Sequence, residues 1–175
     1  MAELAPLLPD PAPLPGVERR DLGVLGIRRL RRFGPDLPAL GGLPAELPAD
    51  IAVGKAAHAG DLLLAVPAPG AWLVLGPHGT LADLARAQDP AAFLAREIGE
   101  ACATVRLAPA LAAEALAAYA PIDPATLTPG TATRARFADM TALMIPEPDG
   151  GLLLLVDAAE ADHLVALLAL LTPDR

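Results

Sequence analysis

The sequence has very few of the side chains on which catalysis and metal binding depend. Its 175 residues include no serine, one cysteine (Cys102), one lysine (Lys55) and three histidines, and only 3% are aromatic. A serine nucleophile is therefore excluded, and a disulfide scaffold or a zinc site of thiolates would need more cysteines. The scarcity of rings argues against a base-stacking platform for single-stranded nucleic acid.

The sequence also lacks the spaced motifs that mark cofactor and metal sites. His58, His78 and His163 stand apart from one another and form no HxH, HExxH or HxxxH pattern, so no metal site is predicted. No GxGxxG follows a predicted strand, and Gly54-Lys55 lacks the hydroxyl residue that a phosphate-binding loop requires. Cys102 has no flanking motif that would activate a thiolate. We therefore predict no catalytic residue in this chain.

The chain is rich in small and aliphatic residues. Hydrophobic residues make up 54% of the sequence and the mean hydropathy is +0.45, which excludes a disordered chain. The longest apolar stretches, 152–156 and 164–171, are too short to span a bilayer. Residues 1–16 show no secretory signal, and a single free cysteine suits a reducing compartment. We expect a cytoplasmic protein with no membrane or nucleic-acid partner.

Charge is distributed unevenly. The first 32 residues hold six arginines and four acidic residues, which gives +2; with −8 for the whole chain, the remainder carries −10. Two interpretations remain open: a partner interface, or a solvated strand edge whose charges block unwanted pairing. The candidate interface residues are Arg28, Arg29, Arg31 and Arg32.

Residue patterns predict an α+β protein. Residues 1–16 contain five prolines and are expected to form an extended arm or a loose terminus, followed by one domain over 17–175. Apolar runs predict strands at 21–32, 61–66, 71–76, 102–107, 132–138, 140–145 and 152–156. Capping residues and apolar spacing predict helices at 80–87, 89–101, 109–119 and 157–171, with Thr80, Asp89 and Asp157 as N-caps.

The order of these elements favours a mostly antiparallel sheet with helices packed on it. The segments 61–66 and 71–76 are separated by a short turn and read as a hairpin. Two strand–helix pairs, 102–119 and 152–171, frame a second hairpin. This arrangement fits a ferredoxin-like β-α-β-β-α-β unit.

The pair Gly60-Asp61 stands before a predicted strand, and the segment GAWLVLGP follows at residues 70–77. In these segments the chain resembles the gamma subunit family of sarcosine oxidases, whose members show a Gly-Asp pair before a strand and then a segment like GPDEWLLVGP. The segment EIGEACATVRLAP at residues 97–109 is similar to the family's DVSDARAVLRLSGP. Pro129-Gly130 follows where the family has PPG. The resemblance covers about residues 17–170.

The resemblance implies a fold, a function and a set of partners. The fold is that of the folate-binding domain shared with the aminomethyltransferase of the glycine cleavage system. The function is that of a non-catalytic subunit in a heterotetramer that oxidatively demethylates sarcosine to glycine. FAD, FMN, NAD, zinc and tetrahydrofolate are assigned to the larger flavoprotein subunits. The resemblance also makes residues 95–100 extended, places a helix within 80–94 and puts a bend near Gly99.

Two other functions remain open from the residues. A stand-alone folate-binding or aminomethyl-transfer protein would need a carboxylate facing the pterin, for which Asp61, Glu97 and Glu100 are the candidates. Trp72, the only tryptophan, is either a core anchor or a stacking surface for a flat ligand. The second of these other functions is that of an interaction domain in another complex.

The chain departs from the family at three places. These are Gly70-Ala71, Gly99 and Cys102, where the family has an acidic pair, a serine and an arginine, respectively.

Overall fold

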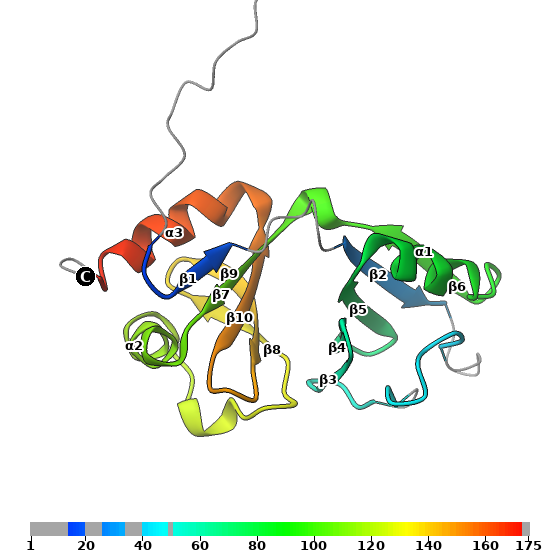
Figure 1. Ribbon diagram of the computed structural model, residues 1–175, viewed down its shortest axis with the longest axis horizontal. Coiled ribbons are helices and arrows are strands. Elements are labelled where there is room, and N and C mark those ends of the chain that lie inside the picture. Colours follow the sequence, from blue (N-terminus) through cyan, green and yellow to red (C-terminus); the bar gives the residue numbers. More distant parts are fainter. Residues whose placement is uncertain (1–13, 20–25, 34–39, 49–50, 173–175) are drawn as a thin grey trace, which may run out of the picture.

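The computed structural model describes residues 14–19, 26–33, 40–48 and 51–172. They form two five-stranded sheets, and every pair of neighbouring strands is antiparallel (Figure 1). Each sheet carries its helices on one side. The α+β class with antiparallel sheets is therefore confirmed.

The first sheet and its helices form what we call the terminal lobe, because it contains the first described strand and the C-terminal part of the chain. Its strand order is β1-β7-β10-β9-β8. Two helices and two single 3-10 turns complete it. The bounds are β1 (Val17–Arg19), β7 (Cys102–Leu107), α2 (Pro109–Tyr119), η2 (Pro124–Thr126), β8 (Thr133–Phe137), β9 (Met140–Pro146), β10 (Leu152–Asp157), η3 (Ala158–Glu160) and α3 (Ala161–Ala169).

The second sheet and its helix form the inserted lobe, which lies between β1 and β7 in the sequence. Its strand order is β3-β4-β5-β2-β6. A single 3-10 turn, η1 (Gly99–Ala101), leads from it to β7. The bounds are β2 (Gly26–Arg32), β3 (Ala56–Ala59), β4 (Leu62–Ala68), β5 (Ala71–Gly76), α1 (His78–Arg86) and β6 (Phe93–Glu97).

Each lobe has a core between its sheet and its helices. In the terminal lobe, Phe137, Leu154 and Leu164 are fully buried between the strands and helices α2 and α3. In the inserted lobe, Leu64 on β4 packs against Leu81 of α1. Burial of such aliphatic side chains supplies most of the folding free energy of each lobe.

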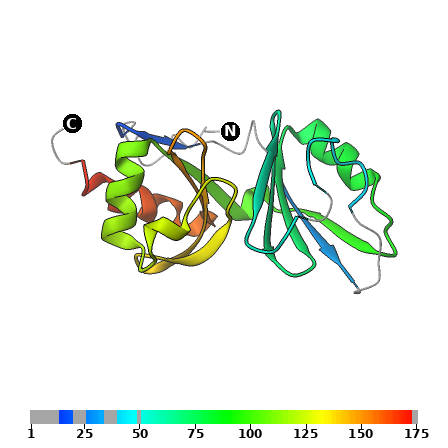
Figure 2. The same ribbon diagram turned by 90° about the horizontal axis from the view of Figure 1, so that it is seen from below.

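A third buried cluster joins the two lobes, which lie side by side (Figure 2). It includes Ile27 and Leu75 from the inserted lobe and Ile145 and Leu153 from the terminal lobe. The backbone also crosses between lobes, because Ala56 N donates to Gly130 O at 3.0 Å and Ala132 N donates to Gly54 O at 2.8 Å. The sheets therefore meet on the faces that their helices leave free.

Two glycines allow close packing in the inserted lobe, Gly26 beneath helix α1 and Gly76 against Leu62 of β4. Gly26 of β2 lies opposite Gly76 of β5. A Cβ at Gly26 would stand 2.8 Å from Leu81 Cδ1 and 2.9 Å from His78 Nδ1, and one at Gly76 would stand 2.4 Å from Leu62 Cδ2. Only glycine allows this approach without displacing the neighbouring side chains.

Most predicted elements are found where the sequence placed them. The hairpin is β4–β5, residues 102–107 are β7 and residues 109–119 are α2. The two segments after residue 131 are β8 and β9, and β10 follows. A hairpin, β8–β9, does lie between the two predicted strand–helix pairs, 102–119 and 152–171. The observed order is β7-α2-β8-β9-β10-α3, so the last helix follows the last strand, whereas in the β-α-β-β-α-β unit it precedes it.

The helix predicted from local signals at 89–101 is wrong. Residues Phe93–Glu97 form β6, so residues 95–97 are extended as the family resemblance implied. Residues 99–100 of the same predicted segment belong instead to the 3-10 turn η1, where the chain bends. Asp89 does accept a hydrogen bond from Ala91 N at 2.9 Å, but it closes a turn, and pairing with β2 then keeps the backbone extended.

Helix ends also differ from expectation. Helix α1 begins at His78 behind Pro77, two residues before the predicted cap Thr80, and it ends at Arg86. Asp157 accepts a hydrogen bond from Ala159 N, so it caps η3, which precedes α3. The predicted strand residues 21–25 and the arm residues 1–13 lie outside the described residues.

Candidate functional site

Two clefts flank the contact between the lobes. The first has a volume of about 410 Å³ and is lined on one side by the β3–β4 hairpin and on the other by the terminal sheet. Its polar lining residues are His58 and Asp61 from the inserted lobe and Thr104 and Glu147 from the terminal lobe. The second cleft, about 360 Å³, lies beside Arg29, Cys102 and Asp157, and a further hollow of about 650 Å³ adjoins it at Arg29 and Ile98.

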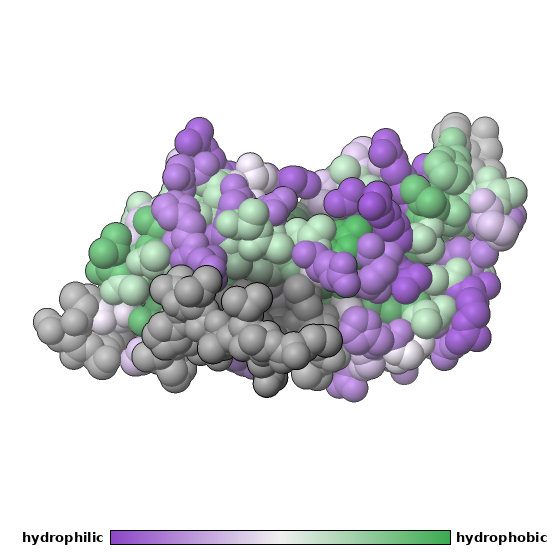
Figure 3. Space-filling model, turned by 90° about the horizontal axis from the view of Figure 1, so that it is seen from above, coloured by the Kyte–Doolittle hydropathy of each residue, from purple (hydrophilic) through white to green (hydrophobic). Residues whose placement is uncertain are grey.

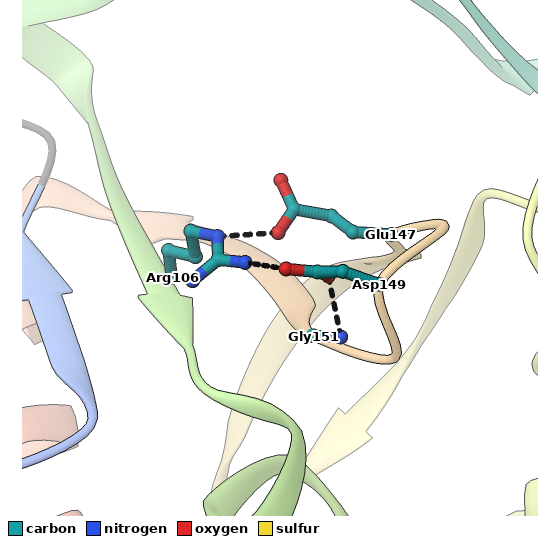
Figure 4. A network of polar contacts seen from close by, with 4 residues as sticks. All are labelled: Arg106, Glu147, Asp149 and Gly151. Carbon is teal, nitrogen blue, oxygen red and sulfur yellow. Dashed lines mark hydrogen bonds and ion pairs between the residues drawn. The ribbon is translucent and has the colours of Figure 1, made fainter.

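An ion-pair network borders the first cleft (Figure 4). Arg106 of β7 donates from Nε to Glu147 Oε2 at 2.5 Å and from Nη2 to Asp149 Oδ2. Gly151 N donates to Asp149 Oδ1 at 2.9 Å. The hydrogen bond from Gly151 and the Arg106 charge hold the pKa of Asp149 below its ordinary value. The network ties the β9–β10 turn to β7, so Glu147 is already occupied by an arginine.

The only cysteine lines the second cleft but is not activated. Cys102 is half-buried, and this burial raises the pKa of its thiol despite the nearby charges of Arg29 and Arg134, which lower it. A raised pKa leaves little thiolate at neutral pH. The structure gives no support for a nucleophilic cysteine.

Glu97, a candidate for binding a pterin, serves the fold. Its Oε1 accepts hydrogen bonds from Ile27 N at 3.0 Å and Gly99 N at 3.1 Å. Its Oε2 accepts from Arg28 Nη2 at 3.3 Å. Glu97 therefore joins the end of β6 to β2 and satisfies the backbone where the chain bends.

Trp72 is a core residue, as the first of its two readings predicted. Its side chain is 7% exposed and lies against Phe93, with the ring centroids 5.9 Å apart. The Arg32 guanidinium lies 5.8 Å from the centroid of the indole ring. A ring enclosed in this way has no open face on which a ligand could stack.

The remaining candidate carboxylates do not come together. Asp61 is exposed in the first cleft, and Glu100 is exposed in the hollow beside Arg96. His163 lies 3.0 Å from Asp139, both exposed. Over the described part of the chain, no three histidine, cysteine or acidic side chains are grouped as a metal site would require.

The four arginines proposed for an interface fall on two faces of one strand. Arg28 and Arg32 lie on the same face of β2 as Leu30, which packs on the α1 side of the sheet. On this side Arg28 pairs with Glu97. Arg29 and Arg31 point to the opposite side and are exposed. Strand β2 is paired with β5 on one side and β6 on the other, so the strand-edge interpretation is wrong.

Sequence reasoning missed Arg96, which lies directly opposite Arg29 on β6. It also missed Leu94, opposite Arg31, which is 51% exposed. The signal was obscured because residues 93–97 carried a false helix prediction. In the view of Figure 3, apolar residues lie between groups of hydrophilic residues on both lobes.

Comparison with known proteins supports the fold by structure alone. No protein-family model matches the sequence, and no curated protein matches it. A chain of the heterotetrameric sarcosine oxidase from Corynebacterium sp. U-96 matches with a TM-score of 0.71 and 18% identity, over 87% of this chain and 80% of that one. The glycine cleavage system aminomethyltransferase T from Bartonella henselae matches with a TM-score of 0.59 and 12% identity, over 88% of this chain and 45% of that protein.

The fold implied by the sequence resemblance is therefore confirmed. This chain has an aminomethyltransferase-like α+β fold that also occurs in a heterotetrameric sarcosine oxidase. It spans less than half the length of the aminomethyltransferase. Among its described helices, none has the length and apolarity needed to cross a membrane.

Proposed function

We propose that this chain is a non-catalytic gamma-type subunit of a heterotetrameric sarcosine oxidase, which oxidatively demethylates sarcosine to glycine. The observation that carries the proposal is the structural match to a chain of such an oxidase, since it accounts for most of both chains. The match to the aminomethyltransferase leaves more than half of that protein without a counterpart.

The described side chains fit a subunit without its own chemistry better than an enzyme. The only cysteine has a raised pKa, and the glutamate that lines the first cleft, Glu147, is already paired with Arg106. Under this proposal FAD, FMN, NAD and tetrahydrofolate belong to the larger flavoprotein subunits. The complex is expected in the cytoplasm.

The candidate residues do not fit tetrahydrofolate in this chain. Glu97 already accepts three hydrogen bonds from the chain itself, and Trp72 is enclosed in the core. Asp61 and Glu100 line different cavities. A pterin needs a carboxylate and an open flat surface in one place, and these residues supply no such place.

Co-expression with tagged flavoprotein subunits of a sarcosine oxidase tests the proposal. We expect the chain to co-purify in stoichiometric amount and the complex to oxidise sarcosine with release of glycine. A chain that stays monomeric beside these subunits would reject the proposal. Recovery in a complex with unrelated proteins would instead favour an interaction domain of another assembly.

Calorimetric titration of the isolated chain with tetrahydrofolate separates the proposal from a stand-alone folate-binding protein. We expect no binding heat at high micromolar ligand. Saturable binding that is lost in Asp61→Asn or Glu100→Gln would support the folate-binding alternative. His163→Gln serves as a control at an exposed site that lines neither cavity.

A further inference from the structure

Part of the inserted sheet is left uncovered by the other residues that the structure describes. The face opposite α1 is buried against the terminal lobe at one end, through Ile27, Leu63, Ala65 and Leu75, and Leu73 is partly buried at the border of this contact. Beyond these residues the same face carries exposed or half-buried side chains. We call this surface the arginine face; its members are Arg29, Arg31, Ala71, Leu73, Leu94 and Arg96.

Strand register places like charges next to each other on the arginine face. Arg29 of β2 lies directly opposite Arg96 of β6, and side chains at such positions are close enough to repel. Glu100 lines the same hollow as Arg29 and Arg96, and Asp157 lines the second cleft beside Arg29. Within the described residues, however, neither Arg29, Arg31 nor Arg96 has a carboxylate within ion-pair distance. Three guanidinium groups therefore share this surface without a direct acidic partner among the described side chains.

The two arginines on the opposite face of β2 both interact with other side chains of the chain. Arg28 pairs with Glu97, and Arg32 lies over the Trp72 ring. Those two side chains are half-buried and serve the fold. The arginines of the arginine face make no such contact with the described part of the chain, and a half-exposed leucine, Leu94, lies among them.

We propose that the arginine face docks on an acidic surface of a partner subunit, with partner carboxylates between Arg29, Arg31 and Arg96 and an apolar side chain over Leu94. The inference rests on the proposed function, since it assumes a partner subunit. Charge complementarity selects the partner's chemistry, because guanidinium groups pair with carboxylates in bidentate geometry. A nucleic acid is disfavoured because the chain as a whole carries −8.

The test compares three charge-reversed variants in the complex with tagged flavoprotein subunits. Arg96→Glu and Arg29→Glu change the arginine face. Arg86→Glu is the matched control, because Arg86 lies on α1, on the other side of the same sheet, and is also exposed. We expect Kd to rise by about tenfold or more for the first two variants and to stay within about twofold for the control. The wild-type complex should also weaken more steeply with salt than the Arg96→Glu complex.

A separate measurement excludes misfolding as the cause. Arg96→Glu places a carboxylate opposite Arg29, so the unfolding midpoint of the isolated chain should stay the same or rise while partner binding falls. A lower midpoint together with lower binding would overturn the inference, because the loss would then follow from a damaged fold.

The remaining outcomes separate this inference from the proposed function. If the wild-type chain assembles and both arginine-face variants bind within about twofold of it, the docking surface is wrong and the proposed function stands. If the wild-type chain does not assemble, both fall. If the chain alone forms a dimer that Arg96→Glu dissociates, the face binds a second copy, which overturns the choice of a partner subunit.

Discussion

The two lobes share an architecture but use their charged residues differently. In the terminal lobe, Arg106 is paired with Glu147 and Asp149, and the pairs fix a turn to the sheet. In the inserted lobe, Arg29 and Arg96 face each other without an acidic partner in the described residues. The role of an arginine on a strand therefore depends on which residues the neighbouring strand or turn places beside it.

The largest effect should come from the core of the terminal lobe. Phe137 is fully buried and its ring lies 5.7 Å from that of Tyr119. Phe137→Ala should reduce the free energy of unfolding by about 3–5 kcal/mol. The only tyrosine lies in the terminal lobe and the only tryptophan in the inserted lobe, so urea unfolding followed by both signals reports on each lobe.

Both midpoints should fall together in Phe137→Ala, because a buried cluster joins the two sheets. A shift of the Tyr119 signal alone would show that the lobes unfold independently. That result would break the comparison, since each lobe would then have to be treated as a separate unit.

Removing the arginine of the paired network should have the next largest effect. Arg106→Leu leaves Glu147, whose side chain is 11% exposed, without its arginine, and we expect a loss of about 2–3 kcal/mol in urea unfolding at pH 7. The control Arg86→Leu breaks an exposed pair with Asp83 and should change stability by less than about 0.5 kcal/mol. Equal losses in both variants would show that the network is no more than a surface feature.

Substitution of the glycine that lies beneath α1 should lower stability by a smaller amount, whereas a control substitution within α1 should raise it. Gly26→Ala would bring its Cβ within 3 Å of Leu81 and His78, and it should cost about 1–2 kcal/mol by thermal unfolding. Gly79, in α1 itself, has no atom within 4 Å of an added Cβ. Gly79→Ala should therefore stabilise the chain through helix propensity, by up to about 1 kcal/mol. Two substitutions of the same sign would contradict the close approach of α1.

The arginine face should yield a small gain in stability. Arg96→Glu replaces a like-charged pair with an opposite-charged one, and we expect a gain of about 0.2–1 kcal/mol in chemical unfolding of the isolated chain. The gain should shrink at high salt, because the pair is exposed. Unchanged stability at low salt would mean that the two guanidinium groups do not interact.

The smallest effect concerns pH. The pKa of Asp149 in the folded chain lies below its ordinary value of 3.8, through the Gly151 hydrogen bond and Arg106. Its stabilising contribution is therefore complete above about pH 4 and is lost as the pH falls through the lower folded value. Asp149→Asn should flatten the acid limb of a plot of stability against pH, measured by urea unfolding between about pH 2 and pH 7. An acid limb as steep as that of the wild-type chain would contradict the role of Asp149.

Local signals predicted the elements whose pattern is complete within the segment. Helix α2 begins at Pro109 and alternates buried Leu111, Ala112 and Ala115 with exposed residues. Strand β10 is an uninterrupted apolar run. Neither needs information from elsewhere in the chain, so periodicity and proline placement were sufficient.

The failures lie where distant residues decide the outcome. Phe93–Glu97 is a strand because β2, far away in the sequence, pairs with it. Glu97 resembled a free carboxylate because its partner Ile27 N lies 70 residues away. The split of the arginines between two faces followed from simple alternation along β2, but the uncovered half of one face depends on how the two sheets meet.

The pairing of β1 with β7 cannot form until the whole inserted lobe has been translated. Val17 lies opposite Leu107, and the whole inserted lobe is translated between these two residues. Strand β1 therefore leaves the ribosome early and waits for its neighbour, while every strand of the inserted lobe has already emerged. Closing so long a loop is entropically costly for a free chain, and a lobe that has already folded shortens the span to be closed. The inserted lobe is thus placed to fold first during translation and to bring β1 and β7 together.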